Sequence, residues 1–150
     1  MGTARQAAEA STTALENHDT NAVRATLAAN FMFDDPSSPA GPVNADQWLY
    51  LTELMFNAFP DFSYNFQIEG EEGNQVWVST QFQGTHTGDW DLSAMGMGVI
   101  PASGKSFLVS RSMSRGTVNK AGKIERIEVT EQDDNGGLPG MLRQLGVNLG

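Results

Sequence analysis

The chain has 150 residues, 39% of them hydrophobic, and no cysteine, which excludes disulfides, thiolate nucleophiles and cysteine metal ligands. A net charge of −9 without a basic patch argues against binding to nucleic acid or to anionic membranes. No run of about 18 apolar residues is present that could span a membrane, and two histidines are too few for a histidine zinc site. We expect one globular domain, residues 1–150, that is cytoplasmic because its first residues lack an apolar signal core.

Two helices are predicted before the first loop. Residues 3–17 are rich in alanine, which favours a helix. Thr20 or Asn21 can cap a second, short helix that continues through Asn30. A loop with two prolines and a glycine follows over residues 37–43.

Asn44 is predicted to cap a third helix over residues 45–59. Apolar side chains recur there every three to four positions, at Trp48, Leu51, Met55 and Phe59. The spacing indicates core packing, and a ligand wall would use the same residues.

The clearest strand pattern covers residues 75–88, where side chains alternate with period two. One face carries Val76, Val78, Thr80, Phe82, Gly84 and His86. His86 ends this row where the strand runs into a loop, a position from which a titratable side chain can face a pocket. The alternative is a histidine that is satisfied within the core or at its rim.

Residues 89–104 contain several glycines and one proline and show no steady period. We expect a loop that acts as a lid beside His86. Met95 and Met97 would adapt to an apolar ligand, because the thioether chain repacks easily. The alternative is a mobile surface hairpin.

A strand is predicted over residues 105–118, but neither of its faces is purely apolar. If the face with Phe107 and Met113 is buried, Arg111 is buried with it. A buried guanidinium needs a carboxylate or a ligand anion. The carboxylates we would test as its partner are Asp34, Asp35 and Glu131. A structural ion pair is the alternative to a ligand site.

The last strand is predicted over residues 123–132, and a short helix or turn over residues 141–145. Helices followed by four or five antiparallel strands indicate an α+β fold in which the helices cover one face of a curved sheet. Such a sheet encloses a conical cavity, which is a natural ligand site.

Five short motifs occur in the chain in a defined order. They are FPD at 59–61, GTHTG at 84–88, PASGK at 101–105, GKI at 122–124 and RQLG at 143–146. Together they resemble motifs of the SnoaL-like polyketide cyclases, which belong to the nuclear transport factor 2-like superfamily. The resemblance spans roughly residues 5 to 146. It implies a cone-shaped α+β fold, a homodimer, a small-molecule ligand and no metal or cofactor.

The resemblance fails at one place that matters for chemistry. Cyclases of this family that close a ring by aldol chemistry have an acid/base aspartate in an EHWD-like run on the last strand. In this chain Ile127 stands at the histidine position and Val129 at the aspartate position. Neither can transfer a proton, so the mechanism cannot be carried over unchanged. Glu131, two residues further along the same face, is the expected substitute.

Two other enzymes of the same fold fit less well. Limonene-epoxide hydrolase has an Arg-x-Asp pair, whereas Arg111 is followed two positions later by Met113. Ketosteroid isomerases need a tyrosine in an oxyanion hole. Nothing in the sequence places Tyr50 or Tyr64 beside a carboxylate.

We therefore expect an enzyme that isomerises, cyclises or hydrates a largely apolar, polyketide-like ligand. His86 is predicted as general acid/base or orienting group, Arg111 as the group that holds an anionic oxygen, and Glu131 as the base. The residues expected to bind the ligand are Trp48, Phe82, Met113, Ile127, Val129 and Asp35. The alternative is a non-catalytic binding or oligomerisation module, which the loss of the last-strand acid/base pair favours.

Overall fold

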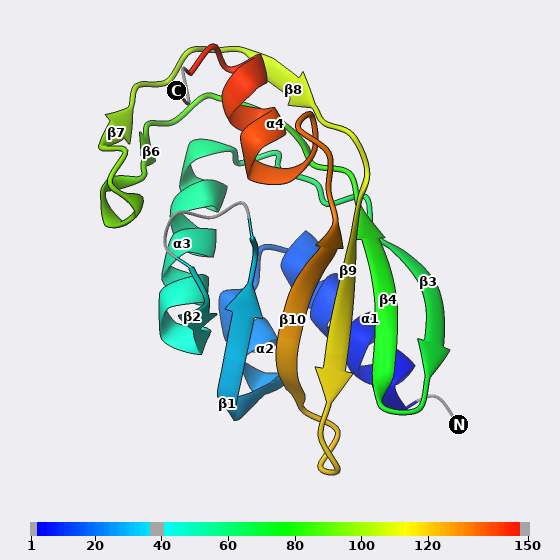
Figure 1. Cartoon of the computed structure of the whole chain (residues 1–150). Coiled ribbons are helices and arrows are strands. Elements are labelled where there is room, and N and C mark those ends of the chain that lie inside the picture. Colours follow the sequence, from blue (N-terminus) through cyan, green and yellow to red (C-terminus); the bar gives the residue numbers. More distant parts are fainter. Residues whose placement is uncertain (1–2, 37–40, 148–150) are drawn as a thin grey trace.

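A computed structural model describes residues 3–36 and 41–147 and confirms the predicted α+β fold (Figure 1). The helices are α1 (Thr3–Glu16), α2 (Thr20–Ala25), α3 (Ala45–Ala58) and α4 (Gly137–Gln144), with a 3-10 turn η1 (Ser93–Met95). The strands are β1 (Leu27–Asp34), β2 (Val43–Asn44), β3 (Gln67–Glu72), β4 (Gln75–Thr80), β5 (Gln83–Thr85), β6 (Trp90–Asp91), β7 (Val99–Ile100), β8 (Ser106–Leu108), β9 (Ser112–Val118) and β10 (Ile124–Glu131). The predicted loop 37–43 lies partly outside the described residues.

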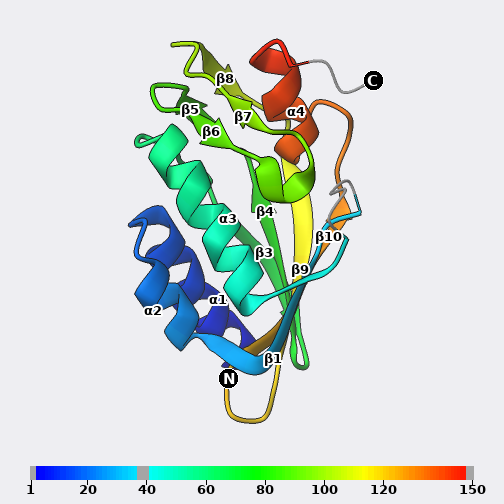
Figure 2. The same ribbon diagram turned by 90° about the vertical axis from the view of Figure 1, so that its left-hand side faces the viewer.

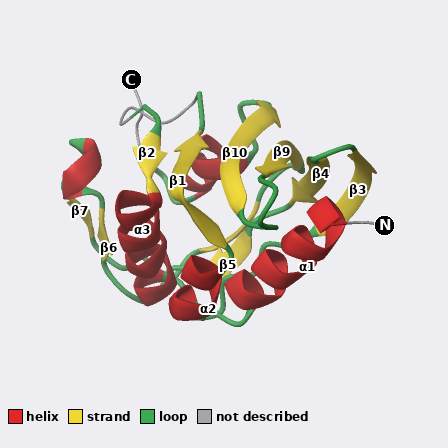
Figure 3. Cartoon of the chain, turned by 90° about the horizontal axis from the view of Figure 1, so that it is seen from below, coloured by secondary structure: helices red, strands yellow, loops and turns green. Residues whose placement is uncertain are grey.

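Six strands form one curved sheet in the order β2-β1-β10-β9-β4-β3. Neighbouring strands are antiparallel except β1 and β10, which are parallel. Helices α1, α2 and α3 lie along one face of this sheet (Figures 2 and 3). The helices and the sheet therefore form two layers, as expected when each element has a single apolar face to bury.

The predicted cap of α3 is confirmed. The Asn44 side chain accepts a hydrogen bond from the Gln47 N–H at 2.9 Å, and the Gln47 side chain accepts one from the Asn44 N–H at 3.0 Å. This reciprocal pair satisfies two N–H groups that would otherwise lack partners at the helix start. The cap fixes where α3 begins and therefore which side chains it turns toward the sheet.

The second helix is shorter than predicted. It ends at Ala25 instead of Asn30, and Asp19 caps it by accepting from the Ala22 N–H at 3.0 Å. Residues 27–34 form β1 instead. Pairing with β10 and burial of aromatic side chains outweigh the weak local helix preference of this segment.

Two of the predicted strands are broken into two, whereas the last one, residues 123–132, is confirmed as the single strand β10. Residues 75–88 form β4 and β5, and residues 105–118 form β8 and β9. β4 and β9 belong to the main sheet, whereas β5 and β8 form a separate two-stranded sheet. With α4 and the β6–β7 hairpin, this pair covers one end of the molecule, at the top of Figure 1.

Residues 89–104 are more regular than the predicted loop. They contain β6, η1 and β7, and the side chains of Trp90 and Leu92 are buried against the main core. The hairpin is therefore anchored by apolar side chains at its base. Among the described residues, no helix has both the length and the apolar character needed to cross a bilayer.

Candidate functional site

A cavity of about 220 Å³ lies between the helices and the inner face of the sheet. Its walls are mostly apolar and come from α1, α3, five strands of the sheet (β1, β2, β4, β9 and β10) and the β6–β7 hairpin. The polar side chains along the strands that reach it are Asp35, Thr80, Ser112, Ser114 and Gln132. A concave apolar site with a few polar groups is typical of small-molecule binding sites.

The pleat of each strand decides which side chains face the cavity. On β4 these are Val76, Val78 and Thr80, and Phe82 continues the row, as the alternation in the sequence predicted. On β9 they are Ser112, Ser114 and Gly116. Of the two faces of the predicted strand 105–118, the one with Ser112 and Ser114 lines the cavity, and Arg111, Met113 and Arg115 are not among the cavity residues.

Five of the six side chains expected to bind a ligand line the cavity: Trp48, Phe82, Ile127, Val129 and Asp35. Met113 does not, because it occupies the opposite face of β9 from Ser112 and Ser114.

Glu131, the predicted base, is exposed and does not line the cavity. The register between β10 and β9 shifts between Val129 and Glu131. This irregularity moves the next inward position to Gln132, which lines the cavity in its place. The amide of Gln132 cannot act as a base at neutral pH.

Arg111 is also exposed and lies outside the cavity. Its guanidinium donates to the Asn65 carbonyl and to the Ser79 hydroxyl oxygen, both at 2.9 Å. Ser79 in turn donates to the Glu69 carboxylate at 2.5 Å. Among the described residues Arg111 forms no ion pair with a carboxylate, so it is neither buried nor paired in the way its sequence position suggested.

His86 is completely buried but does not line the cavity. Its Nδ1 lies 3.0 Å from the Ser103 hydroxyl, its ring packs against Phe59, and Nε2 has no hydrogen-bond partner among the described residues. Burial lowers the pKa of His86, and the nearby Ile100 carbonyl and Asp89 carboxylate oppose that effect. Burial therefore favours the neutral imidazole, which lies inside the protein and outside the cavity wall.

Three of the five motifs that carry the family resemblance contact one another around His86. The Thr85 N–H donates to Asp61 at 2.8 Å, and the Gly88 N–H donates to the Ala58 carbonyl at 3.0 Å. The backbone of His86 pairs with residues 104–105, since its N–H donates to the Lys105 carbonyl. FPD, GTHTG and PASGK thus form one structural junction that joins α3 to the β5–β8 pair.

Asp35 is the one carboxylate that lines the cavity among the described residues. It follows Asp34, which pairs with Glu128 across the parallel β1–β10 ladder. Val129 follows Glu128, so Asp35 and Val129 occupy neighbouring positions on adjacent strands, and both face the cavity. The Asp35 carboxylate therefore lies on the strand next to Val129, the position at which this chain lacks the aspartate of the resembling cyclases.

Tyr64 is a second ionisable group in the cavity wall and was not predicted there. Burial, and to a smaller extent the Glu16 carboxylate, raises the pKa of its hydroxyl above the ordinary value for tyrosine. Glu16 accepts a hydrogen bond from the Tyr64 backbone N–H at 2.7 Å, which fixes this segment against α1. The neutral phenol can donate a hydrogen bond within the cavity.

Sequence reasoning missed Tyr64, Ser112 and Gln132 as cavity residues. The first lies in an irregular segment between α3 and β3, and the other two depend on a strand break and a register shift. None of these has a periodic signal. Among residues 3–36 and 41–147, no three His, Cys, Asp or Glu side chains gather in a way that would hold a metal ion.

Comparison with known proteins agrees with this geometry. A family model described as SnoaL-like polyketide cyclase matches residues 5–144. No curated protein matches the chain. Solved structures with a similar fold include AclR, a candidate hydroxylase from Streptomyces galilaeus, with a TM-score of 0.71, 16% identity and coverage of 95% of both chains.

IdmH from Streptomyces antibioticus, a candidate polyketide cyclase, has a TM-score of 0.70 and 22% identity over 96% of this chain and 99% of its own. TerC, co-crystallised with polyporic acid, has a TM-score of 0.66 and 11% identity over 97% and 99% of the two chains. At these identities the likeness establishes the fold, and the chemistry has to be argued from the cavity.

Proposed function

The chain belongs to the SnoaL-like polyketide cyclase family, and on this premise we propose that it isomerises or cyclises a largely apolar, polyketide-like ketone with Asp35 as the proton-transfer group. The observation that carries the proposal is that Asp35 is the one carboxylate in the cavity wall within the described part of the chain. A positioned carboxylate next to a bound ketone is the usual means of removing a proton from the carbon beside a carbonyl.

The proposed chemistry begins with proton transfer from that carbon to Asp35, which leaves an enolate. In an isomerisation, Asp35 returns the proton to another carbon of the same enolate. In a ring closure, the enolate carbon attacks a second carbonyl of the ligand. A carbon–carbon bond forms, the second carbonyl becomes an alkoxide, and the protonated Asp35 gives its proton to that oxygen.

Tyr64 suits the role of hydrogen-bond donor to the enolate oxygen. Its raised pKa keeps the phenol protonated at neutral pH, and it makes no hydrogen bond through its side chain to the described residues, so the donor is available to a ligand. Donors aimed at a developing oxyanion are among the largest contributions to catalysis of this kind.

The position of Asp35 supports its assignment over Glu131. Asp35 lies beside Val129, which occupies the position of the aspartate in the ring-closing cyclases that this chain resembles. Glu131, in contrast, is exposed on the other side of the sheet. His86 and Arg111 have no access to the cavity wall, so the proposal gives neither of them a role in proton transfer. TerC, which shares the fold, was co-crystallised with polyporic acid, which supports a small-molecule ligand for this chain as well.

The second candidate is a non-catalytic small-molecule binder of the same fold. The apolar side chains at Ile127 and Val129 favour it, since they turn the last strand into a hydrophobic wall. The two functions differ in one measurable property: an enzyme exchanges the protons next to the ligand's carbonyl with solvent, and a binder leaves them in place.

The test is a thermal-shift screen against polycyclic aromatic polyketides, steroids, terpenoid epoxides and fatty acids, followed by proton exchange in D₂O. A ligand at 100 times its Kd should stabilise the fold by about 2.7 kcal/mol. Ketone hits are then followed by NMR for loss of the signal of the protons beside the carbonyl. Exchange accelerated by the protein and lost in Asp35→Asn supports the enzyme. Stabilisation without accelerated exchange supports the binder and contradicts the proposed enzyme.

The family resemblance also implies a homodimer, which we include in the proposal. Size-exclusion chromatography with light scattering measures this directly. A species of twice the chain mass of 16.2 kDa is expected, and a clean 16.2 kDa species would contradict it.

A further inference from the structure

Three polar side chains lie in one row across the inner face of the sheet. Thr80 on β4 pairs with Ser112 on β9. Met113 pairs with Glu131 on β10, so the next position on each strand brings Ser112 opposite Gln132. All three line the cavity. We call Thr80, Ser112 and Gln132 the polar row.

Within the polar row, Ser112 provides the strongest evidence for a bound ligand. The residue is only 5% exposed, and its hydroxyl oxygen has no hydrogen-bond partner among the described residues. A buried hydroxyl without a partner costs about 1–3 kcal/mol, and native proteins rarely leave one unsatisfied. A ligand oxygen in the cavity would supply the missing partner.

Two glycines at the start of α4 lie close to two members of the polar row, Ser112 and Gln132. A β-carbon on Gly136 would lie 2.8 Å from the Ser112 hydroxyl oxygen, and one on Gly137 would collide with the Gln132 amide. Gly137 also has a φ of +53°, which disfavours other residues there. The backbone where α4 begins can therefore approach Ser112 and Gln132 closely.

The charge of the cavity wall restricts the ligand. No Lys, Arg or His lines the cavity in the part of the chain that the structure describes, and Asp35 is the one Asp or Glu in that lining. An anionic ligand would lose its hydration without gaining a cationic partner, and it would also be repelled by Asp35. An uncharged oxygen has neither disadvantage.

The volume restricts the ligand further. An apolar cavity of about 150 Å³ accommodates one benzene ring, so about 220 Å³ suits two fused rings. We propose that the polar row is a subsite that binds an uncharged carbonyl or hydroxyl oxygen on a two-ring apolar ligand, with Ser112 as the main hydrogen-bonding group. This inference rests on the proposed function in taking the cavity as the ligand site, but it does not require turnover.

Isothermal titration calorimetry with three probes tests the subsite. The probes are 2-tetralone, which has a ketone oxygen, tetralin, which is the matching hydrocarbon, and 2-naphthoate, which is an anion of similar size. We expect 2-tetralone to bind the wild-type protein about five- to tenfold more tightly than tetralin, as one additional hydrogen bond provides. We expect 2-naphthoate at pH 7 to bind at least tenfold more weakly than 2-tetralone.

The decisive variant is Ser112→Ala, which removes a hydroxyl that has no hydrogen-bond partner among the described residues and should therefore fold normally. It should reduce 2-tetralone affinity about five- to tenfold, down to that of tetralin, and leave tetralin affinity unchanged. The matched control is Ser114→Ala, on the same strand and face but one row away, which should change either affinity less than twofold. An equal loss for both probes, an equal loss in Ser114→Ala, tight binding of 2-naphthoate, or no binding of either neutral probe would overturn the proposal.

Proton exchange into bound 2-tetralone separates this inference from the proposed function. Ser112-dependent binding without exchange leaves the subsite intact and refutes the enzyme. If exchange depends on Asp35 but the affinity for 2-tetralone is unchanged in Ser112→Ala, the enzyme is supported and the subsite is refuted.

Discussion

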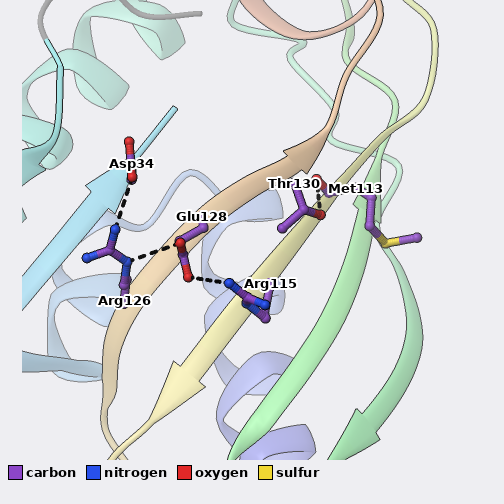
Figure 4. A network of polar contacts seen from close by, with 6 residues as sticks. All are labelled: Asp34, Met113, Arg115, Arg126, Glu128 and Thr130. Carbon is purple, nitrogen blue, oxygen red and sulfur yellow. Dashed lines mark hydrogen bonds and ion pairs between the residues drawn. The ribbon is translucent and has the colours of Figure 1, made fainter. Parts of the chain in front are cut away.

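Asp34 and Asp35 are consecutive residues whose side chains lie on opposite faces of the sheet. Asp34 Oδ2 accepts a hydrogen bond from Arg126 at 3.0 Å in the network of Figure 4, whereas Asp35 lines the cavity. Successive side chains of a β-strand point to opposite faces of the sheet, so these two identical side chains have different surroundings. It also provides a matched pair of variants that separates effects inside the cavity from effects of charge alone.

Asp35→Asn should lower proton exchange into 2-tetralone by about 10²-fold or more, because an amide cannot accept the proton. Asp34→Asn removes the same charge from the chain and should change the rate less than about twofold. The measurement is the initial exchange rate by NMR at fixed ligand occupancy. Equal losses in the two variants would show that charge or stability, and not proton transfer by Asp35, is responsible.

His86 should make the fold sensitive to pH below neutrality. Because burial lowers its folded-state pKa below 6.5, the unfolded chain binds more protons than the folded protein between the two pKa values. The stabilising contribution of the neutral, buried His86 to the free energy of unfolding is fully present above about pH 6.5. It is lost as the pH falls through the folded-state pKa of His86. Urea denaturation at pH 7.5, 6.5 and 5.5 measures this slope.

His86→Gln should flatten that slope, since glutamine does not titrate. His18→Gln is the control, because it retains His86 and should retain the slope. Parallel pH dependences for the wild-type protein and His86→Gln would contradict the assignment of this transition to His86.

Gly88 should not tolerate a side chain. A β-carbon there would lie 2.5 Å from the Asn57 carbonyl oxygen, which is backbone and cannot move aside. Gly88→Ala should therefore destabilise the fold by roughly 1–3 kcal/mol. Gly70→Ala is the control, since no atom lies within 4 Å of its β-carbon position, and it should stay within about 0.5 kcal/mol in urea denaturation. Equal stabilities of the two variants would refute the close packing of the GTHTG junction.

Glu128 lies between two arginines on the outer face of the sheet. It accepts a hydrogen bond from Arg115 at 2.9 Å and pairs with Arg126 at 3.4 Å (Figure 4). The hydrogen bond from Arg115 is the main reason that the pKa of Glu128 is lowered. Its stabilising contribution is therefore present above the ordinary glutamate pKa of 4.5 and is lost as the pH falls through the lowered folded-state value.

Glu128→Gln should destabilise the fold by about 1 kcal/mol at low salt and by less in 1 M NaCl, since these side chains are partly exposed and screened. Glu125→Gln, on the same strand but without an ion pair among the described residues, should have little effect. A salt-independent difference between the two variants would show that packing, and not charge, explains the loss.

Patterns that depend on local geometry were predictable from the sequence. The Asn44 cap and the inward face of β4 needed only a capping side chain and a period of two. The end of α2 was not predictable, because residues 27–34 are held as a strand by β10, which is distant in the sequence. The break between β4 and β5 was missed because Phe82 and Gly84 continue the alternation of β4 although β5 lies outside the main sheet.

The candidate site was harder to predict than the fold, because a single-residue irregularity reverses which side chain faces inward. The register shift after Val129 is what replaces Glu131 by Gln132 in the cavity. The break before β9 likewise turns Ser112 inward and leaves Arg111 outside. GTHTG identified the family but not the chemistry, since its histidine packs in a structural junction.

The parallel pairing of β1 with β10 has a consequence for the order of folding. The ion pair between Asp34 and Arg126 joins positions 92 residues apart, across the same two strands that carry Asp35 and Val129. The hairpins β3–β4 and β9–β10 close short loops and can form early, whereas β1 must wait for a strand near the end of the chain. On the ribosome, the wall that holds Asp35 is therefore completed last, and until then β1 has an open edge that chaperones or other chains can bind.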